Sequence, residues 1–169
     1  MSVGVIGTGY VGLVTGTCFA ETGNRVVCMD VDEAKIQMLK KGQMPIFEPG
    51  LAELVSRNQK DGRLSFTSSL EEVVAESRII FVAVGTPSCE DGFSDLRAVV
   101  QVCEGVAALM TEYRILVIKS TVPVGTSQEI RDELRLLTDV PFDLVSNPEF
   151  LKEGTAVEDF MKPDRVVVG

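Results

Sequence analysis

The chain has 169 residues, of which 45% are hydrophobic and 24% charged, and this size and composition predict one globular domain with a buried core. Its net charge of −9 at pH 7 argues against nucleic acid or an anionic membrane surface as the main partner. Because no apolar run approaches the roughly 18 residues of a membrane span and the N-terminus lacks a basic secretory segment, we expect a cytoplasmic protein.

Strand-like apolar runs alternate with helical periods along the whole chain. The continuous apolar runs at residues 79–84 and 115–118 are typical of strands covered on both faces. The alternation predicts an α/β fold with a doubly wound, mostly parallel Rossmann-type sheet and helices on both faces. We expect strands near residues 2–6, 25–29, 64–66, 78–83, 114–119, 142–146 and 165–168. We expect helices near residues 10–23, 32–41, 50–60, 69–75, 95–110 and 125–138.

Capping residues support three of these helices. Asp32 precedes the second helix, and Asp95 precedes the long fifth helix. Ser69 is followed by Glu72, which is the pattern of a capping box. These residues predict where the helices begin.

The first thirty residues contain a dinucleotide-binding fingerprint between an expected strand and an expected helix. Gly7 would allow the tight turn, Gly9 the close approach of a pyrophosphate, and Gly12 the close packing of the helix. The helix N-terminus would offer unpaired N–H groups to the phosphates. Asp30 ends the second strand, where a carboxylate would bind ribose hydroxyls and repel a 2′-phosphate, which favours NAD over NADP. The alternative is a glycine-rich turn that binds nothing.

The inventory of reactive side chains limits the chemistry of the chain. The four cysteines have no metal-type CxxC spacing, so we expect no metal site. Cys18, Cys28 and Cys103 fall in apolar patterns and are predicted core residues, whereas Cys89 lies in a polar loop and is most simply a spare thiol. Because the chain has no histidine, acid–base chemistry must use carboxylates, lysine or hydroxyls.

The loops that follow the strands predict where a ligand binds. In parallel sheets ligands bind at the carboxyl ends of strands, near the point where strand order reverses. Turn chemistry alone would explain one such polar loop, but five loops that converge on one edge predict a site. These loops are residues 7–12, 30–35, 84–91, 120–125 and 147–154.

Five motifs at this edge and near it are similar to those of the UDP-glucose/GDP-mannose dehydrogenase family, and the resemblance covers essentially the whole chain. In order they are Gly-Thr-Gly-Tyr-Val-Gly at residues 7–12, Glu-Pro-Gly-Leu at 48–51, Val-Gly-Thr-Pro at 84–87, Lys-Ser-Thr-Val-Pro at 119–123 and Asn-Pro-Glu-Phe-Leu-Lys-Glu-Gly at 147–154. The resemblance implies a four-electron oxidation of the C6 alcohol of a nucleotide sugar by two NAD. UDP-glucose is the expected substrate and UDP-glucuronate the product.

The resemblance also implies roles for individual residues. Thr121 matches a threonine that helps to hold the catalytic water, since a hydroxyl can both donate and accept. Glu149 matches the acid that transfers protons in thioester hydrolysis, which suits a carboxylate shielded from solvent. Lys119 is expected to be a charge at a strand end. The implied NAD site consists of Gly7, Gly9, Tyr10, Val11, Gly12, Asp30, Lys35, Thr86, Pro87, Ser120 and Glu153. The implied substrate contacts are Glu149, Phe150, Leu151, Lys152 and Glu153.

In the family, three further catalytic groups follow this domain: the nucleophilic cysteine that carries the thioester, an oxyanion-stabilising lysine and an asparagine. We therefore expect residues 1–169 to be the NAD-binding domain alone, without the central helix and the C-terminal substrate domain. Such a chain would bind NAD or NADH but would not turn over nucleotide sugar. The full-length protein is expected to be a homodimer or a higher homo-oligomer.

Three other functions are compatible with the sequence. The same family also acts on GDP-mannose and on UDP-N-acetylhexosamines. A related nucleotide domain occurs in dehydrogenases of the 6-phosphogluconate and hydroxyacyl-CoA types, although the motif at residues 147–154 argues against them. The third alternative is a non-catalytic NAD sensor, which would not need the segments 119–123 and 147–154.

Overall fold

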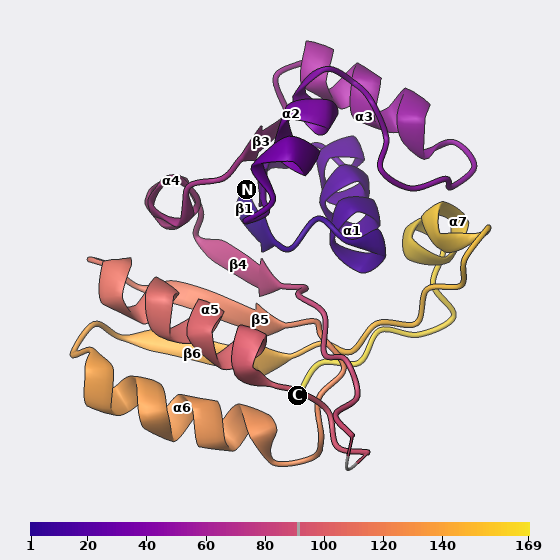
Figure 1. The fold of residues 1–169 in the computed structure, drawn as a ribbon. Coiled ribbons are helices and arrows are strands. Elements are labelled where there is room, and N and C mark those ends of the chain that lie inside the picture. Colours follow the sequence, from indigo (N-terminus) through magenta and orange to yellow (C-terminus); the bar gives the residue numbers. More distant parts are fainter. Residues whose placement is uncertain (91) are drawn as a thin grey trace.

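Six parallel strands form one sheet in the computed structural model, which describes residues 1–90 and 92–169 (Figure 1). The strand order is β3-β2-β1-β4-β5-β6, so the order reverses between β1 and β4. The predicted fold class is therefore confirmed, with every strand pair of the sheet parallel. The strands are β1 (Ser2–Ile6), β2 (Arg25–Met29), β3 (Leu64–Thr67), β4 (Ile79–Val82), β5 (Arg114–Ile118) and β6 (Phe142–Ser146).

Helices cover both faces of the sheet and give two hydrophobic clusters. The helices are α1 (Tyr10–Glu21), α2 (Glu33–Lys40), α3 (Leu51–Lys60), α4 (Leu70–Glu76), α5 (Arg97–Leu109), α6 (Thr126–Leu137) and α7 (Ala156–Met161). Residues of α1, α2, α3 and α7 pack on one face, and residues of α4, α5 and α6 pack on the other. Successive side chains of a strand point to opposite faces, so Val117 of β5 joins the α1 cluster and Leu116 joins the α5 cluster.

The helix caps follow the sequence with two differences. The Asp32 side chain accepts a hydrogen bond from the Lys35 amide at 3.0 Å, as predicted for an N-cap. The Ser69 hydroxyl accepts from the Glu72 amide at 3.1 Å, but the Glu72 carboxylate accepts from the Thr67 hydroxyl at 2.6 Å. The predicted capping box is thus formed on one side only.

The long helix α5 begins at Arg97, with Leu96 as its N-cap. Asp95 still caps this end, because its carboxylate accepts from the Arg97 amide at 3.0 Å. The helix therefore begins two residues later than expected, and the capping group is the expected one.

The C-terminal segment differs most from the sequence prediction. The strand expected at 165–168 is wrong: within the described chain these residues belong to no strand, and only Gly169 exchanges two backbone hydrogen bonds with Ser146, at 2.8 and 2.9 Å. Val166 and Val168 are exposed, so the apolar run does not pack into the core as a strand of the sheet would. The short helix α7, which the sequence did not predict, lies beside α1 in Figure 1 although the two are far apart in the chain.

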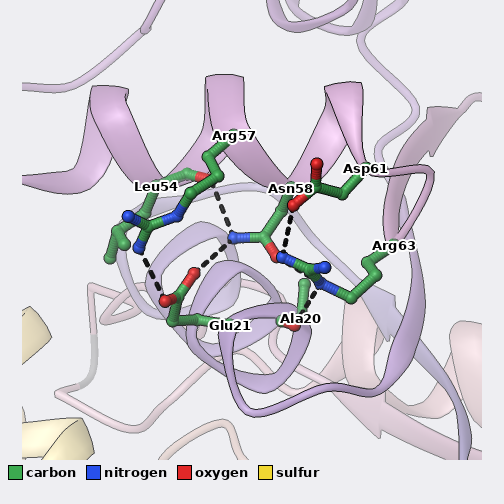
Figure 2. Close-up of polar contacts among 7 residues, drawn as sticks. All are labelled: Ala20, Glu21, Leu54, Arg57, Asn58, Asp61 and Arg63. Atoms are coloured by element: carbon green, nitrogen blue, oxygen red, sulfur yellow. Dashed lines mark hydrogen bonds and ion pairs between the residues drawn. The ribbon is translucent and has the colours of Figure 1, made fainter.

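A buried polar cluster joins the C-terminal end of α1 to α3, and we call it the Asn58 cluster (Figure 2). The fully buried Asn58 amide donates to a Glu21 carboxylate oxygen at 2.9 Å and to the Leu54 carbonyl at 2.8 Å. The Asn58 side-chain oxygen accepts from Arg63 at 2.9 Å, and Arg57 pairs with the second Glu21 oxygen at 2.6 Å. Every polar atom of Asn58 thus has a partner, as a buried amide requires.

Candidate functional site

The glycine loop between β1 and α1 has the geometry that its sequence predicts. Gly7 has a φ of +98°, and a Cβ there would lie 2.6 Å from the Ala83 carbonyl oxygen. A Cβ on Gly12 would lie 1.8 Å from the Gly7 carbonyl oxygen, so the first turn of α1 packs directly on the loop. A Cβ on Gly9 would meet no atom within 4 Å, which leaves open space at the helix N-terminus. The loop therefore fits a pyrophosphate, which binds to free N–H groups at such a position.

Asp30 lies directly after β2 and is fixed by four hydrogen bonds. One of its carboxylate oxygens accepts from the Thr8 amide at 2.9 Å, the Thr8 hydroxyl at 2.8 Å and Lys35 Nζ at 2.9 Å. The other oxygen accepts from the Asp32 amide at 3.1 Å. Burial opposes ionisation of Asp30, but the bonds from Lys35, Asp32 and Thr8 outweigh it and lower its pKa to about 2. A permanently charged carboxylate therefore lies beside the glycine loop.

The loops after β4 and β5 contact each other through two hydroxyl groups. The buried Ser120 hydroxyl donates to the Val84 carbonyl at 2.6 Å, and the Thr86 hydroxyl donates to the Thr121 carbonyl at 3.1 Å. Pro87 follows Thr86 on the exposed side, and its carbonyl accepts from the Asp95 amide at 2.8 Å. Thr121 itself is exposed. The expected loop 84–91 ends at residue 91, which lies outside the described residues.

The segment after β6 carries the predicted proton-transfer residue Glu149. Glu149 is half-buried, and its carboxylate accepts from the Leu151 amide at 2.8 Å. Lys119 is buried, and its Nζ donates to the Asn147 side-chain oxygen at 3.3 Å. Burial lowers the pKa of Lys119, while the charge of Glu149 opposes that shift. Lys119 lies at a strand end as expected, but its side chain is buried and not solvated.

Two of the five predicted substrate residues, Phe150 and Leu151, line a small apolar cavity beside this segment. The cavity has a volume of about 230 Å³, and its walls include Phe19, Lys119, Phe150 and Leu151. Phe150 is 51% exposed, and the Arg165 guanidinium lies 5.6 Å from its ring centroid. A hollow of about 510 Å³ at the opposite edge of the sheet contains none of the predicted site residues. The apolar cavity and a neighbouring hollow lined by Phe150, Leu151 and Lys152 are therefore the candidates for substrate contacts.

The remaining predicted residues lie at the same edge. Val11, in the first turn of α1, is half-buried and packs against the cluster on the α1 face. Lys152 pairs with Asp159 at 3.4 Å, and Glu153 is exposed beside Tyr10, whose pKa its charge helps to raise. The structure thus brings the predicted cofactor and substrate residues to one edge, on both sides of the strand-order reversal.

Sequence reasoning gave no role to Glu48, which the structure places among these residues. The buried Glu48 carboxylate accepts from the Tyr10 hydroxyl and from the Gly154 and Ala156 amides, at 2.8 and 2.9 Å for the two amides. The Tyr10 hydroxyl also lies 3.2 Å from the Lys152 carbonyl. We call these five residues the Glu48 cluster. The only sequence signal for it was the motif at residues 48–51.

The ionisation states in the Glu48 cluster are well defined. Burial opposes ionisation of Glu48, but the bonds from Tyr10 and from the Gly154 and Ala156 amides outweigh it and lower its pKa. Burial and the Glu48 carboxylate together raise the pKa of Tyr10 to about 12. Tyr10 is therefore a neutral donor and Glu48 a charged acceptor at neutral pH.

Comparison with known proteins identifies the domain. A sequence model described as the NAD binding domain of the UDP-glucose/GDP-mannose dehydrogenase family matches residues 1–169. The chain belongs to this family. Its predicted cofactor, NAD, is the one for which the family domain is named. The expectations of a sensor module or of a different dehydrogenase type are not favoured, since the match extends through residues 119–123 and 147–154.

Relatives of the family are similar along the whole of this chain. It is 52% identical to UDP-glucose 6-dehydrogenase of Rhizobium meliloti and 49% identical to UDP-glucose 6-dehydrogenase TuaD of Bacillus subtilis, with 100% and 99% of the chain covered. The solved UDP-glucose dehydrogenase of Pyrobaculum islandicum superposes with a TM-score of 0.95 at 44% identity, over 99% of this chain. The matches cover 39%, 37% and 40% of those proteins, so the chain spans about two fifths of their length.

None of the described helices is long and apolar enough to cross a membrane. The described residues also contain no group of three or more acidic or cysteine side chains that could hold a metal ion.

Proposed function

We propose that this chain is the NAD-binding part of an enzyme that oxidises the C6 alcohol of UDP-glucose to UDP-glucuronate in two NAD-dependent steps. The observation that carries the proposal is the similarity to UDP-glucose 6-dehydrogenases along the whole chain, at 52% and 49% identity. The similarity to the GDP-mannose dehydrogenase of Pseudomonas aeruginosa is lower, at 34%. UDP-glucose is therefore preferred over GDP-mannose as the substrate.

The geometry of the carboxyl edge supports the predicted roles of several residues in holding NAD. The N–H groups at the start of α1 would bind the pyrophosphate, with Gly9 leaving room for it. Asp30 would accept hydrogen bonds from the ribose hydroxyls, because it is ionised and fixed beside the loop. Bound NAD would supply the hydride acceptor for each oxidation step. The further predicted contacts of NAD are Tyr10, Val11, Lys35, Thr86, Pro87, Ser120 and Glu153.

Thr121 and Glu149 would act on the water that hydrolyses the thioester. The Thr121 hydroxyl lies at the exposed edge and could hold a water molecule by donating and accepting. Glu149 would accept the proton of that water, as a positioned carboxylate can do in general-base catalysis. Phe150 and Leu151 would exclude bulk water from the reacting groups.

We further propose that the nucleophilic cysteine lies outside residues 1–169. Cys18, Cys28 and Cys103 are buried, and burial raises the pKa of each to about 12, which keeps them as thiols. Cys89 is exposed in the turn after β4 and has no counterpart in the family's catalytic motifs. The central helix and substrate domain of the family would supply the nucleophile. The homo-oligomeric state and the cytoplasmic location of the full-length protein stay predictions.

Calorimetric titration of the chain with NAD and with NADP tests the cofactor site. We expect NAD to bind at least about tenfold more tightly than NADP, and Asp30→Ala to weaken NAD binding about 10- to 100-fold, as expected when a charged acceptor is lost. Asp132→Ala, which removes an exposed carboxylate on α6, is the control and should leave the affinity for NAD unchanged. Equal binding of NAD and NADP would contradict the role of Asp30. Steady NADH production by this chain with UDP-glucose would contradict the external nucleophile.

A further inference from the structure

The Glu48 carboxylate joins two segments that have different tasks in the proposed function. Tyr10, which donates to it, is the first residue of α1 and follows the glycine loop directly. Gly154 and Ala156, whose amides also donate to it, lie 106 and 108 residues further along the chain than Glu48. The segment between them and β6 carries Glu149. One buried side chain therefore links the proposed cofactor loop to the proposed proton-transfer segment.

The bonding pattern needs a charged acceptor at residue 48. Three donors converge on its two oxygens, and the residue is only 5% exposed, so water cannot replace a lost partner easily. Hydrogen bonds to an ionised acceptor are about twice as strong as neutral ones. A glutamine has the same shape but only one acceptor oxygen, and its NH₂ group would face an amide donor.

The hydrogen bonds to Glu48 also hold the end of the segment after β6, where α7 begins. Ala156 is the first residue of α7, and the N-cap residue Thr155 makes no capping bond with its own side chain. The Glu48 carboxylate accepts from the Ala156 amide and therefore satisfies a free N–H at this helix end. The Tyr10 hydroxyl contacts the Lys152 carbonyl in the same turn. The turn at residues 152–155 is thus held from α1 and from Glu48 together.

We propose that Glu48 is a positioning residue of the reaction, which sets the place of the segment 149–153 relative to the glycine loop. Glu48 acts through Tyr10 and through the backbone of Gly154 and Ala156, without touching substrate or cofactor. Its loss would leave the glycine loop intact, because β1 and α1 form that loop, but would let Glu149 and Glu153 move from their places. This inference rests on the proposed function, since the reaction assigns the task to Glu149.

The test compares Glu48→Gln with Glu21→Gln, the same chemical change at the other end of α1. In the full-length enzyme that carries this domain, we expect Glu48→Gln to lower kcat about 10- to 100-fold, because displacement of a reacting group by about 1 Å has effects of this size. The KM for NAD and the calorimetric Kd for NAD should change by a smaller factor than kcat, because the predicted NAD contacts outside Tyr10 and Glu153 are not bonded to Glu48. Glu21→Gln should leave kcat within about twofold of the wild type.

Hydrogen exchange of the backbone amides gives a second readout that does not need activity. In the 169-residue chain, Glu48→Gln should speed exchange at Gly154 or Ala156 at least about tenfold, and Glu21→Gln should not. The proposal would be overturned if Glu48→Gln left exchange unchanged at both amides, or if it speeded exchange but left kcat unchanged. Equal losses of kcat in Glu48→Gln and Glu21→Gln would also overturn it. If the wild-type enzyme fails to oxidise UDP-glucose, the proposed function fails, while the exchange rates still decide whether Glu48 holds the segment.

Discussion

The two ends of α1 are both fixed by buried polar clusters, but the clusters join different parts of the chain. The Asn58 cluster connects residues between 20 and 63, all within the first half of the sheet (Figure 2). The Glu48 cluster connects Tyr10 with the segment after β6, across the reversal of strand order. The first cluster lies at the amino edge of the sheet and the second at the carboxyl edge, where the candidate site lies. Similar chemistry therefore stabilises the fold at one end and organises the site at the other.

Gly12→Ala, near the end of α1 that contacts Glu48, is expected to have the largest effect on the free energy of unfolding. The added Cβ would lie 1.8 Å from the Gly7 carbonyl oxygen, a backbone atom that cannot move without disrupting the loop. We expect a loss of about 4 kcal/mol or more in the free energy of unfolding, measured by urea denaturation. Gly9→Ala is the control, since its Cβ meets nothing within 4 Å, and it should cost less than about 1 kcal/mol. Equal stability of the two variants would contradict the close packing.

Asn58→Ala is expected to have the next largest effect and to act at the other end of α1. It removes the two hydrogen bonds that the Asn58 amide donates and the one that its oxygen accepts, so half-buried Glu21 keeps only Arg57 and half-buried Arg63 keeps Ala20 and Asp61. We expect a loss of about 2–3 kcal/mol in the free energy of unfolding, with the Kd for NAD unchanged under folding conditions. A change in NAD affinity comparable to that of Asp30→Ala would show that this cluster also shapes the cofactor loop.

Low pH should destabilise the carboxyl edge of the sheet by protonating Asp30. The expected loss in the free energy of unfolding is smaller than for the two substitutions above. The pKa of Asp30 is lowered to about 2 in the folded chain, so the stabilising charge is fully present above the ordinary aspartate pKa and is lost as pH falls towards 2. After allowance for solvent screening, we expect wild type to lose about 1–2 kcal/mol more than Asp30→Asn between pH 5 and about pH 2. Urea denaturation across this pH range measures the difference. Parallel pH profiles of the two proteins would contradict the assigned hydrogen bonds.

Local patterns in the sequence predicted most of the elements correctly. The expected bounds of β1, β2 and β6 agree with the structure, because continuous apolar runs between turns determine them. Asp32 and Asp95 cap their helices as predicted, since a cap needs only neighbours in the chain. The wrong strand at 165–168 has the same kind of apolar pattern, but a strand also needs a partner strand, and the pattern carries no information about one.

The residues of the candidate site also fall into two groups: those that the sequence predicted and those that it did not. The glycine loop and Asp30 could be recognised from the sequence, because a strand, a turn and a helix of standard spacing place them together. The family resemblance supplied Thr121 and Glu149, whose roles stay predictions. Thr8, which donates two of the four bonds to Asp30, and the buried state of Lys119 had no signal in the sequence.

The sequence by itself determined the sheet, its loops and the kind of cofactor, because short-range periodicity and turn chemistry decide these features. Only the tertiary structure decided that Glu48 receives three donors, that α7 forms, and that the segment after β6 lies against the start of α1. The physical reason is that these contacts join residues far apart in the chain: Glu48 lies 38 positions from Tyr10 and more than 100 from Gly154 and Ala156. The buried Glu48 carboxylate gains its hydrogen bonds only once folding has brought the start of α1 and the segment after β6 together.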